Sequence, residues 1–200
     1  MSRVSQPAET VAGDLPGVSF TRRAVAGDTH PRLTCDACGF VRYENPKIVV
    51  GAVCCWEDRV LLCRRDIEPR RGHWTIPAGY LELGETTEQG AAREVREEAR
   101  ADVTVGPLLG VYCIPRISQV LMIYRAAMRS ADCEAGDETS EVRLARASDI
   151  PWDDLAFPSV RWALTHHAEA PTDSPFPPFA APPQQAGPLP ATGQPLPSGG

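Results

Sequence analysis

Apolar residues gather in short runs between positions 47 and 145, and these runs have the length and composition of β-strands. The first two, Lys47–Trp56 and Arg59–Arg65, are separated only by Glu57-Asp58, which predicts a hairpin with a two-residue turn. Valine, isoleucine, leucine and tyrosine are frequent in three later segments. We therefore expect further strands at Val103–Ile114, Gln119–Met128 and 142–145.

The pattern changes to a helical period at about residue 86. Thr86 is followed three positions later by Gln89, which is the spacing of a capping box and predicts that a helix starts here. At roughly 100° per residue, small apolar residues share one side of this helix. The other side carries three carboxylates within about a third of the circumference: Glu94, Glu97 and Glu98.

A second helix is expected at 158–168, with Pro158 in its first turn and with Val160 and Leu164 facing the interior. Short strands together with two substantial helices predict an α/β fold in which a mixed sheet lies between helices.

Composition and charge narrow the class of protein. A chain of 200 residues with a net charge of −6 and 42% hydrophobic residues fits one modest soluble domain with tails. The acidic balance gives no electrostatic reason to expect nucleic acid, and no apolar run approaches the roughly 18 residues that cross a bilayer. The first residues lack the apolar region of a secretory signal. We expect a cytoplasmic protein that acts on a small molecule without a membrane partner, and a homodimer is left open.

The cysteines agree with a reducing compartment. There are seven, an odd number, and several lie inside apolar strand-like runs, where we expect them to be small core residues: Cys54, Cys55, Cys63 and Cys113.

Composition also divides the chain into four parts. Residues 1–29 are small and polar with scattered Gly and Pro, and we expect them to be poorly ordered. A short cysteine-containing segment at 30–46 precedes the regular domain at 47–169. Residues 170–200 are rich in proline, so we expect an extended, mobile tail that buries no core.

The acidic side of the first helix has two interpretations. Charge runs on helices are usually solvated faces. Like charges at i, i+3 and i+4 nevertheless cost a few tenths of a kcal/mol per pair, and Arg93 relieves only part of this cost. Clustered carboxylates are hard oxygen ligands that suit Mg²⁺ or Mn²⁺, so we favour a metal site.

The same stretch resembles the Nudix box. Gly79 is followed after five residues by Glu85, and then after seven by the run Arg-Glu-Val-Arg-Glu-Glu at 93–98. The family is one of hydrolases acting on nucleoside diphosphates linked to another moiety, and the resemblance implies the Nudix α/β/α sandwich. One position departs from the family pattern, because Arg100-Ala101 replaces the usual Gly and apolar residue. A non-Gly residue there costs on the order of 1 kcal/mol, so the helix end is the feature placed in doubt.

The resemblance also implies roles for individual residues. Glu94, Glu97 and Glu98 would hold Mg²⁺ or Mn²⁺, and the carbonyl oxygen of Gly79 often completes the metal shell. Arg93 would orient the glutamates through a salt bridge, and Glu85 would support the loop before the helix. A general base must lie within about 3 Å of the attacking water, and our two candidates are Glu98 and Glu141.

Residues outside the box are candidates for substrate binding. Arg64, Arg65 and Arg71, with Arg70, precede the box and could clamp phosphates through charge-assisted bonds, although arginines beside acids are also ordinary surface. The rings that could stack on an adenine or flavin are Tyr80, Tyr112 and Trp152, and each has a core position as its alternative. We expect His166 and His167 to lie on the surface.

A Cys-x-x-Cys turn lies before the regular domain. Residues 27–47, which include Cys35 and Cys38, resemble the second half of the zinc ribbon that precedes some Nudix domains. Closed structural zinc sites need four ligands, and where the first cysteine pair would stand the chain reads Gly-Asp-Leu-Pro-Gly at 13–17. We favour a knuckle without zinc. The alternative is an ion held by Cys35, Cys38 and His30 with a water or a second chain.

The wider resemblance, over about residues 27–168, is to the branch with the ADP-ribose and FAD diphosphatases. It implies that ADP-ribose gives AMP and ribose 5-phosphate, or that FAD gives AMP and FMN. NADH pyrophosphatases carry a Ser-Gln-Pro-Trp motif after the box, whereas Ser118-Gln119 here is followed by Val120-Leu121, so that activity ranks second. A third hypothesis is a sensor that binds a nucleotide without hydrolysing it.

Overall fold

The computed structural model describes residues 10–12, 17–172 and 174–182. The chain divides into two compact units, an N-terminal unit, Met1–Asn45, and a C-terminal unit, Pro46–Gly200, and each is described by itself. The expected disorder of residues 1–9 and 13–16 and of the tail from 183 onward lies outside the described residues.

The N-terminal unit is a small antiparallel sheet in which the strands follow in sequence order. Its strands are β1, Thr10–Ala12, β2, Ser19–Arg23, β3, Arg32–Cys35, and β4, Val41–Arg42. Strand β2 corrects the expectation that residues up to 29 are poorly ordered. The segment has little apolar pattern, but its backbone pairs with β1 on one side and β3 on the other, and long-range pairing of this kind leaves no local sequence signal.

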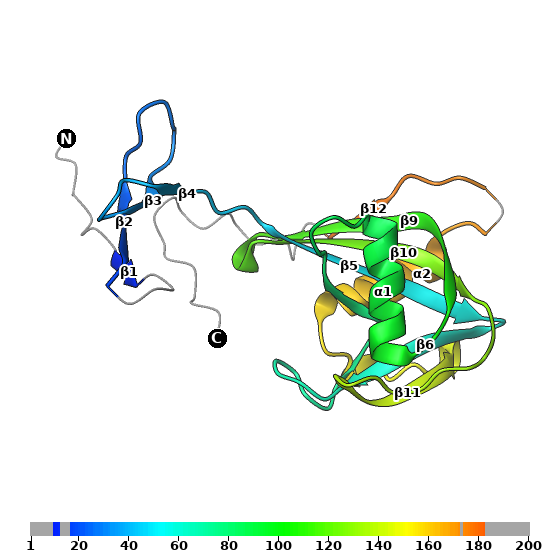
Figure 1. The fold of residues 1–200 in the computed structure, drawn as a ribbon. Helices are drawn as coiled ribbons and strands as arrows, with labels where there is room; N and C mark the ends of the chain where they lie inside the picture. Colours follow the sequence, from blue (N-terminus) through cyan, green and yellow to red (C-terminus); the bar gives the residue numbers. More distant parts are fainter. Residues whose placement is uncertain (1–9, 13–16, 173, 183–200) are drawn as a thin grey trace. The chain divides into compact units, whose positions relative to one another are not determined.

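A mixed sheet forms the centre of the C-terminal unit, with strand order β11-β6-β5-β10-β9-β12, while β7 pairs with β6 and β8 with β5 (Figure 1). Strands β5 and β10 run parallel, and β5 and β6 form the predicted hairpin. The bounds are β5, Lys47–Trp56, β6, Arg59–Arg65, β7, Trp74–Thr75, β8, Ala78–Tyr80, β9, Val103–Ile114, β10, Gln119–Met128, β11, Thr139–Arg146, and β12, Phe179–Ala180. Short 3₁₀ turns lie at Pro115–Ile117, Ala147–Asp149 and Trp152–Asp154.

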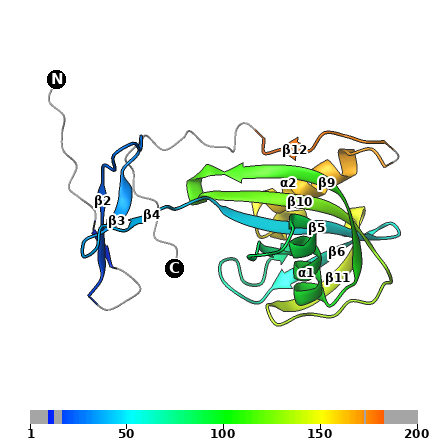
Figure 2. The same cartoon turned by 45° about the horizontal axis from the view of Figure 1, so that its top comes forward.

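Two α-helices of the described residues cover the sheet, α1, Thr87–Ala99, on one face and α2, Pro158–Glu169, on the other (Figures 1 and 2). The alternation of β5 supplies both cores. Val50, Ala52 and Cys54 pack in the cluster that includes α1 residues, whereas Val53 belongs to the cluster that includes α2. The predicted α/β/α sandwich with a mixed sheet is therefore confirmed, and the inward positions of Val160 and Leu164 are confirmed as well.

The segment after α2 differs from the expected mobile tail. Phe179 and Ala180 form β12, which pairs in parallel with β9 at the edge of the sheet. The rings of Phe176 and Phe179 pack against the core beside α2, and Phe179 stacks on His166 with ring centroids 4.4 Å apart. Aromatic residues supply enough apolar area to dock this segment although it is rich in proline.

Two smaller expectations about single residues need correction. All seven cysteines are free, and Cys54, Cys63 and Cys35 are buried, but Cys113 is exposed. His166 and His167 are half-buried rather than on the surface. Burial lowers the pKa of His167 to about 4, and its Nε2 lies 3.3 Å from the sulfur of Cys55. Neither α1 nor any other helix of the described residues is long and apolar enough to span a membrane.

Candidate active site

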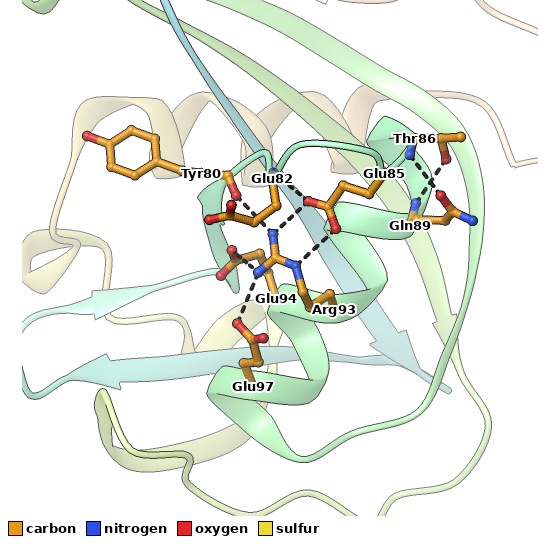
Figure 3. Close-up of polar contacts among 8 residues, drawn as sticks. All are labelled: Tyr80, Glu82, Glu85, Thr86, Gln89, Arg93, Glu94 and Glu97. Atoms are coloured by element: carbon orange, nitrogen blue, oxygen red, sulfur yellow. Dashed lines mark hydrogen bonds and ion pairs between the residues drawn. The ribbon is translucent and has the colours of Figure 1, made fainter.

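The loop before α1 and the first turn of α1 fix the direction of the helix. Thr86 is the N-cap, its side chain accepts the amide of Gln89, and the Gln89 side chain accepts the amide of Thr86, which completes the predicted capping box (Figure 3). At the other end, Arg100 takes a left-handed conformation with φ of 52°. Arg100 stands where the family usually has glycine, and it adopts the left-handed conformation that glycine favours at the cost of some strain.

Arg93 lies at the centre of the acidic face and contacts several acids at once (Figure 3). Its guanidinium donates to both carboxylate oxygens of Glu85, at 3.0 and 2.7 Å, and to the carbonyl oxygen of Tyr80 at 2.9 Å. One terminal nitrogen also lies 2.7 Å from Glu94 and 3.0 Å from Glu97. The hydrogen bonds from Arg93 hold the pKa of Glu85 down to about 2, so Glu85 is ionised and the pair is fixed. Arg93 therefore positions the loop and two of the three glutamates.

Glu94 is buried under the loop, with 7% of its surface exposed. Burial raises its pKa, and the hydrogen bond and charge of Arg93 oppose this shift. A Cβ atom at Gly79 would collide with the Glu94 carboxylate, so a larger residue would force this carboxylate or the loop to move. Glycine therefore suits a position where the backbone passes close to a carboxylate that Arg93 holds.

Glu98 is the most perturbed acid of the site. Burial, followed by the charge of Glu94, raises its pKa to about 8, while the charge of Arg65 lowers it. Its Oε2 atom is buried and has no hydrogen-bond partner within the part of the chain that the structure describes. An unpaired buried carboxylate oxygen costs free energy, and a second acid close by adds to that cost.

The glutamate cluster, Glu94, Glu97 and Glu98, fits a divalent cation by its chemistry. Within the described residues no three Asp, Glu, His or Cys side chains converge tightly enough to enclose an ion, since Arg93 draws Glu94 and Glu97 to itself. The unpartnered oxygen of Glu98 beside Glu94 is nevertheless a site where a cation would remove both the desolvation cost and the repulsion. Oxygen donors of this kind suit Mg²⁺ or Mn²⁺.

The loop before β11 brings a further acid to the glutamates. Gly136 donates its amide to the carbonyl oxygen of Glu98 at 3.0 Å, which joins the loop to the last turn of α1. Two residues after Gly136, the charge of Glu138 is among those that raise the pKa of both Glu94 and Glu98. The sequence predicts Glu141 as the loop acid, but Glu141 lies in β11 and Glu138 lies in the loop. The acidic segment was a usable signal, but it did not tell which of its acids faces the site.

Glu141 has its own partners on the neighbouring strand. It pairs across the sheet with Arg64, whose guanidinium lies 3.6 Å from its carboxylate, and Arg143 donates to it at 3.2 Å. Its side chain is half exposed, and its contacts are with these two arginines of the sheet.

The arginines named as phosphate ligands lie in different surroundings. Arg65 acts electrostatically on Glu98, and its guanidinium lies 5.3 Å from the centre of the Phe157 ring. Arg64 donates to the carbonyl oxygen of Gly72 at 2.8 Å, and Arg71 is paired with Asp66 at 2.7 Å. Arg65 is therefore the arginine that the structure brings to the glutamate cluster.

Tyr112 does not offer a face to a ligand. It is fully buried on β9, its ring meets Trp162 edge to face, and its hydroxyl lies 2.9 Å from Nδ1 of His166. The core alternative that the sequence left open is the correct one, because this side of β9 is covered by α2. Tyr80, by contrast, is exposed and has the ammonium group of Lys47 5.1 Å from its ring centre.

An open groove lies at the start of α2. It has a volume of about 370 Å³ and is lined by aromatic and cationic side chains, mainly Arg70, Trp152, Phe157, Arg161 and Trp162. Trp152, named from the sequence as a stacking candidate, lies in this groove, where Arg161 covers its ring at 5.3 Å. Phe157, which lines the groove, also contacts the guanidinium of Arg65, whose charge lowers the pKa of Glu98.

Comparisons with known proteins agree with this geometry. A NUDIX domain model matches residues 45–168, and a Nudix N-terminal model of the zinc-ribbon type matches residues 17–44. An ADP-ribose pyrophosphatase of Methanocaldococcus jannaschii is 28% identical over 113 residues, 54% of this chain and 67% of the relative. An NAD-capped RNA hydrolase of Photobacterium profundum is 30% identical over 131 residues, 64% of this chain and 48% of the relative.

Among solved structures, a NUDIX hydrolase from Nitrosomonas europaea is similar at 45% identity with a TM-score of 0.74, over 78% of this chain and 89% of that one. This chain spans about half or less of the length of most of the curated relatives it matches.

Proposed function

Because the chain belongs to the Nudix hydrolase family, we propose that it hydrolyses the diphosphate bond of a nucleoside diphosphate linked to another moiety, with ADP-ribose or FAD as the favoured substrate. The observation that carries the proposal is the buried oxygen of Glu98 near Glu94, which has no hydrogen-bond partner among the residues that the structure describes. An acid held in this way is destabilised until a cation binds, which is the state that a metal-dependent hydrolase needs before its substrate arrives.

The residues proposed to hold Mg²⁺ or Mn²⁺ are the glutamate cluster and the carbonyl oxygen of Gly79. When bound, the ion would neutralise the negative oxygens of the diphosphate and polarise the bond that breaks. The protein contributes the positions of these ligands. Arg93 fixes Glu94 and Glu97, and Gly79 allows the loop to approach the Glu94 carboxylate.

The attacking water must lose a proton to an acid of the site. The sequence offered Glu98 and Glu141, and the electrostatic contact of Glu138 with Glu98 adds Glu138 as a third candidate. Separate Glu138→Gln and Glu141→Gln variants distinguish the loop acids. The base is the one whose loss lowers kcat about 100-fold and removes the acidic limb of the pH–rate profile.

The groove at the start of α2 is the proposed site for the base or flavin ring. Trp152 and Phe157 supply flat apolar faces. Arg65, whose guanidinium lies over the Phe157 ring and whose charge acts on Glu98, would meet a phosphate oxygen. Stacking of a base on an aromatic ring is worth about 1–3 kcal/mol, so Trp152→Leu should raise KM about tenfold with kcat unchanged. Phe40→Leu, which changes an exposed aromatic of the N-terminal unit, serves as the control.

Hydrolysis of NADH or of an NAD cap on RNA is the second candidate. It is favoured by the relative named as an NAD-capped RNA hydrolase, although this chain spans only 48% of that protein. In each reaction water attacks one phosphorus of the diphosphate, the bond from that phosphorus to the bridging oxygen breaks, and the proton of the water passes to the base. NADH would give AMP and the reduced nicotinamide mononucleotide, whereas a capped RNA would give nicotinamide mononucleotide and an RNA that ends in a 5′-monophosphate.

The test is product chromatography with ADP-ribose, FAD, NADH and a nucleoside triphosphate in parallel. Each is incubated with Mg²⁺, with Mn²⁺ and with EDTA, and Glu98→Gln protein serves as the inactive preparation. We expect AMP from ADP-ribose or FAD that disappears with EDTA. AMP mainly from NADH would favour the second candidate. Nucleotide binding without any product would reject hydrolysis and favour the sensor hypothesis.

A further inference from the structure

The N-terminal unit matches a zinc-ribbon family model but lacks the ligands of a zinc ribbon. Residues 17–44 contain only two cysteines, Cys35 and Cys38, and the sequence has no cysteine before them. A closed structural zinc site needs four ligands. Asp28, the nearest acid to His30, is already occupied, since it accepts the amide of His30 at 3.1 Å and the guanidinium of Arg32 at 2.7 Å. The residues present do not fit a structural zinc.

Asp36, inside the Cys-x-x-Cys turn, makes the contacts that tie this turn to the rest of the sheet. Its carboxylate accepts the hydroxyl of Ser19 at 2.7 Å and that of Thr21 at 3.1 Å, and it forms an ion pair with Arg23. Its backbone amide donates to the carbonyl oxygen of Ser19 at 3.0 Å. These four residues are called the Asp36 cluster.

The Asp36 cluster follows from strand geometry. Residues i, i+2 and i+4 of a strand point to the same face, so the three donors of β2 form one row. Asp36 follows directly after β3, which pairs with β2 in the register Phe20 to Cys35, and its carboxylate therefore meets that row. The hydrogen bond from Ser19, together with that from Thr21, lowers the pKa of Asp36, so the carboxylate is charged at neutral pH.

A structural zinc normally clamps the knuckle to the strands of a ribbon, and here the carboxylate occupies that structural role. We propose that the N-terminal unit folds without zinc and that the Asp36 cluster replaces the metal as the clamp between the Cys-x-x-Cys turn and β2. The Cys35 thiol remains buried beneath the turn, and Cys38 stays exposed.

The experiment uses the full chain, expressed with zinc in the medium. Metal content is measured together with hydrogen exchange of the β2 and β3 amides, before and after EDTA. Charge-assisted hydrogen bonds are among the stronger ones, so Asp36→Asn should speed this exchange by about tenfold or more. Glu44→Gln is the matched control, because it removes an acid of the same unit whose ion pair with Arg22 is exposed. We expect that control to stay within about twofold of the wild type.

Cys38→Ser distinguishes a zinc ion from the Asp36 cluster as the contact that holds the turn to β2. A zinc site would lose its ion when either cysteine is replaced. We expect substoichiometric zinc, no effect of EDTA on exchange, and protection in Cys38→Ser within about twofold of the wild type. If Asp36→Asn unfolds the unit while Cys38→Ser keeps it folded, the proposal is supported. Two results would overturn it. One is a content of about one zinc per chain, or one per two chains, if Cys38→Ser loses both this zinc and the amide protection. The other is an Asp36→Asn variant whose amides exchange as slowly as those of the Glu44→Gln control.

Discussion

Asp36 in the N-terminal unit and Glu98 in the C-terminal unit are both acids that follow or end a regular element, yet their surroundings are opposite. Asp36 accepts two hydroxyls and a guanidinium, and its pKa is lowered. Glu98 has one oxygen without a partner in the described residues, and its pKa is raised to about 8. The protein itself supplies hydrogen-bond donors to the Asp36 carboxylate. The free oxygen of Glu98 could be stabilised by a bound ligand such as a cation.

This difference is the one expected between a structural carboxylate and the functional carboxylate that we propose Glu98 to be. A satisfied acid stabilises its unit and would gain nothing from a cation. An unsatisfied acid destabilises the protein until a ligand arrives, which is the usual compromise at functional sites. The number of hydrogen bonds to a carboxylate is therefore more informative here than the presence of acids in a row.

The largest expected effect is the loss of catalysis in Glu98→Gln. If Glu98 holds the ion or accepts the proton, kcat should fall by about 10²–10⁴, measured as AMP release at saturating substrate and Mg²⁺. Glu88→Gln, in the first turn of the same helix, is the matched control and should stay within about twofold. Equal activity in the two variants would remove the distinction between Glu98 and an ordinary surface acid.

The stability of the metal-free protein should depend on pH because of Glu98. The unfolded state loses this proton near 4.5, but the folded state keeps it up to about 8. The unfolded chain thus binds fewer protons between these values, and stability falls as pH rises through that window, on the order of a few kcal/mol in total. Urea unfolding at pH 5 and pH 8 measures this slope.

Two additions sharpen the pH experiment. Mg²⁺ should recover stability at pH 8 more than at pH 5, because the ion and the proton compete for the same carboxylate. Glu98→Gln should flatten the slope, whereas Asp36→Asn should leave it in place. A slope that persists in Glu98→Gln would assign the titration to another group.

Gly79→Ala tests how closely the chain approaches Glu94. The new methyl group would meet the carboxylate, so Glu94 or the loop must shift, and a displacement of about 1 Å at a catalytic site can cost about 100-fold in kcat. Gly39→Ala is the contrasting variant. Its Cβ would have nothing within 4 Å, and only its positive φ of 74° adds strain. We expect Gly39→Ala to leave kcat unchanged, and an equal loss in both variants would show that crowding at Glu94 is not the cause.

Local patterns predicted most of the C-terminal unit. Strands β9 and β10 have the expected bounds, and Thr86 caps α1 as its sequence indicates. Strand β2 and strand β12 were missed because their stability comes from distant partners. Ser19–Arg23 depends on neighbouring strands and on Asp36, and Phe179 depends on the ring of His166.

The candidate site divides in the same way. The glutamates of α1, Arg93 and Gly79 are set by spacing within one helix and its loop, and spacing is visible in a sequence. Glu138 acts on the glutamates from the loop before β11, whereas Glu141 lies in β11 itself. The position of Glu141 relative to Glu138 depends on a shift in register between Thr139 and Glu141, where the ladder with β6 is irregular. A bulge of this kind moves a side chain relative to its neighbours, and nothing in the acidic segment itself announces it.

Tyr112, on the other face of the sheet, is a second residue whose place in the core or in the site could not be read from the sequence. Its substitution gives the smallest predicted effect. Alternation along β9 separates two faces, but helices cover the sheet on both sides, so the pattern does not tell which face binds a ligand. Tyr112→Phe removes only the hydroxyl that pairs with His166, and we expect a loss of about 1 kcal/mol in unfolding free energy. KM and kcat should be unchanged, in contrast to Trp152→Leu. A rise in KM without any loss of stability would return Tyr112 to the substrate site.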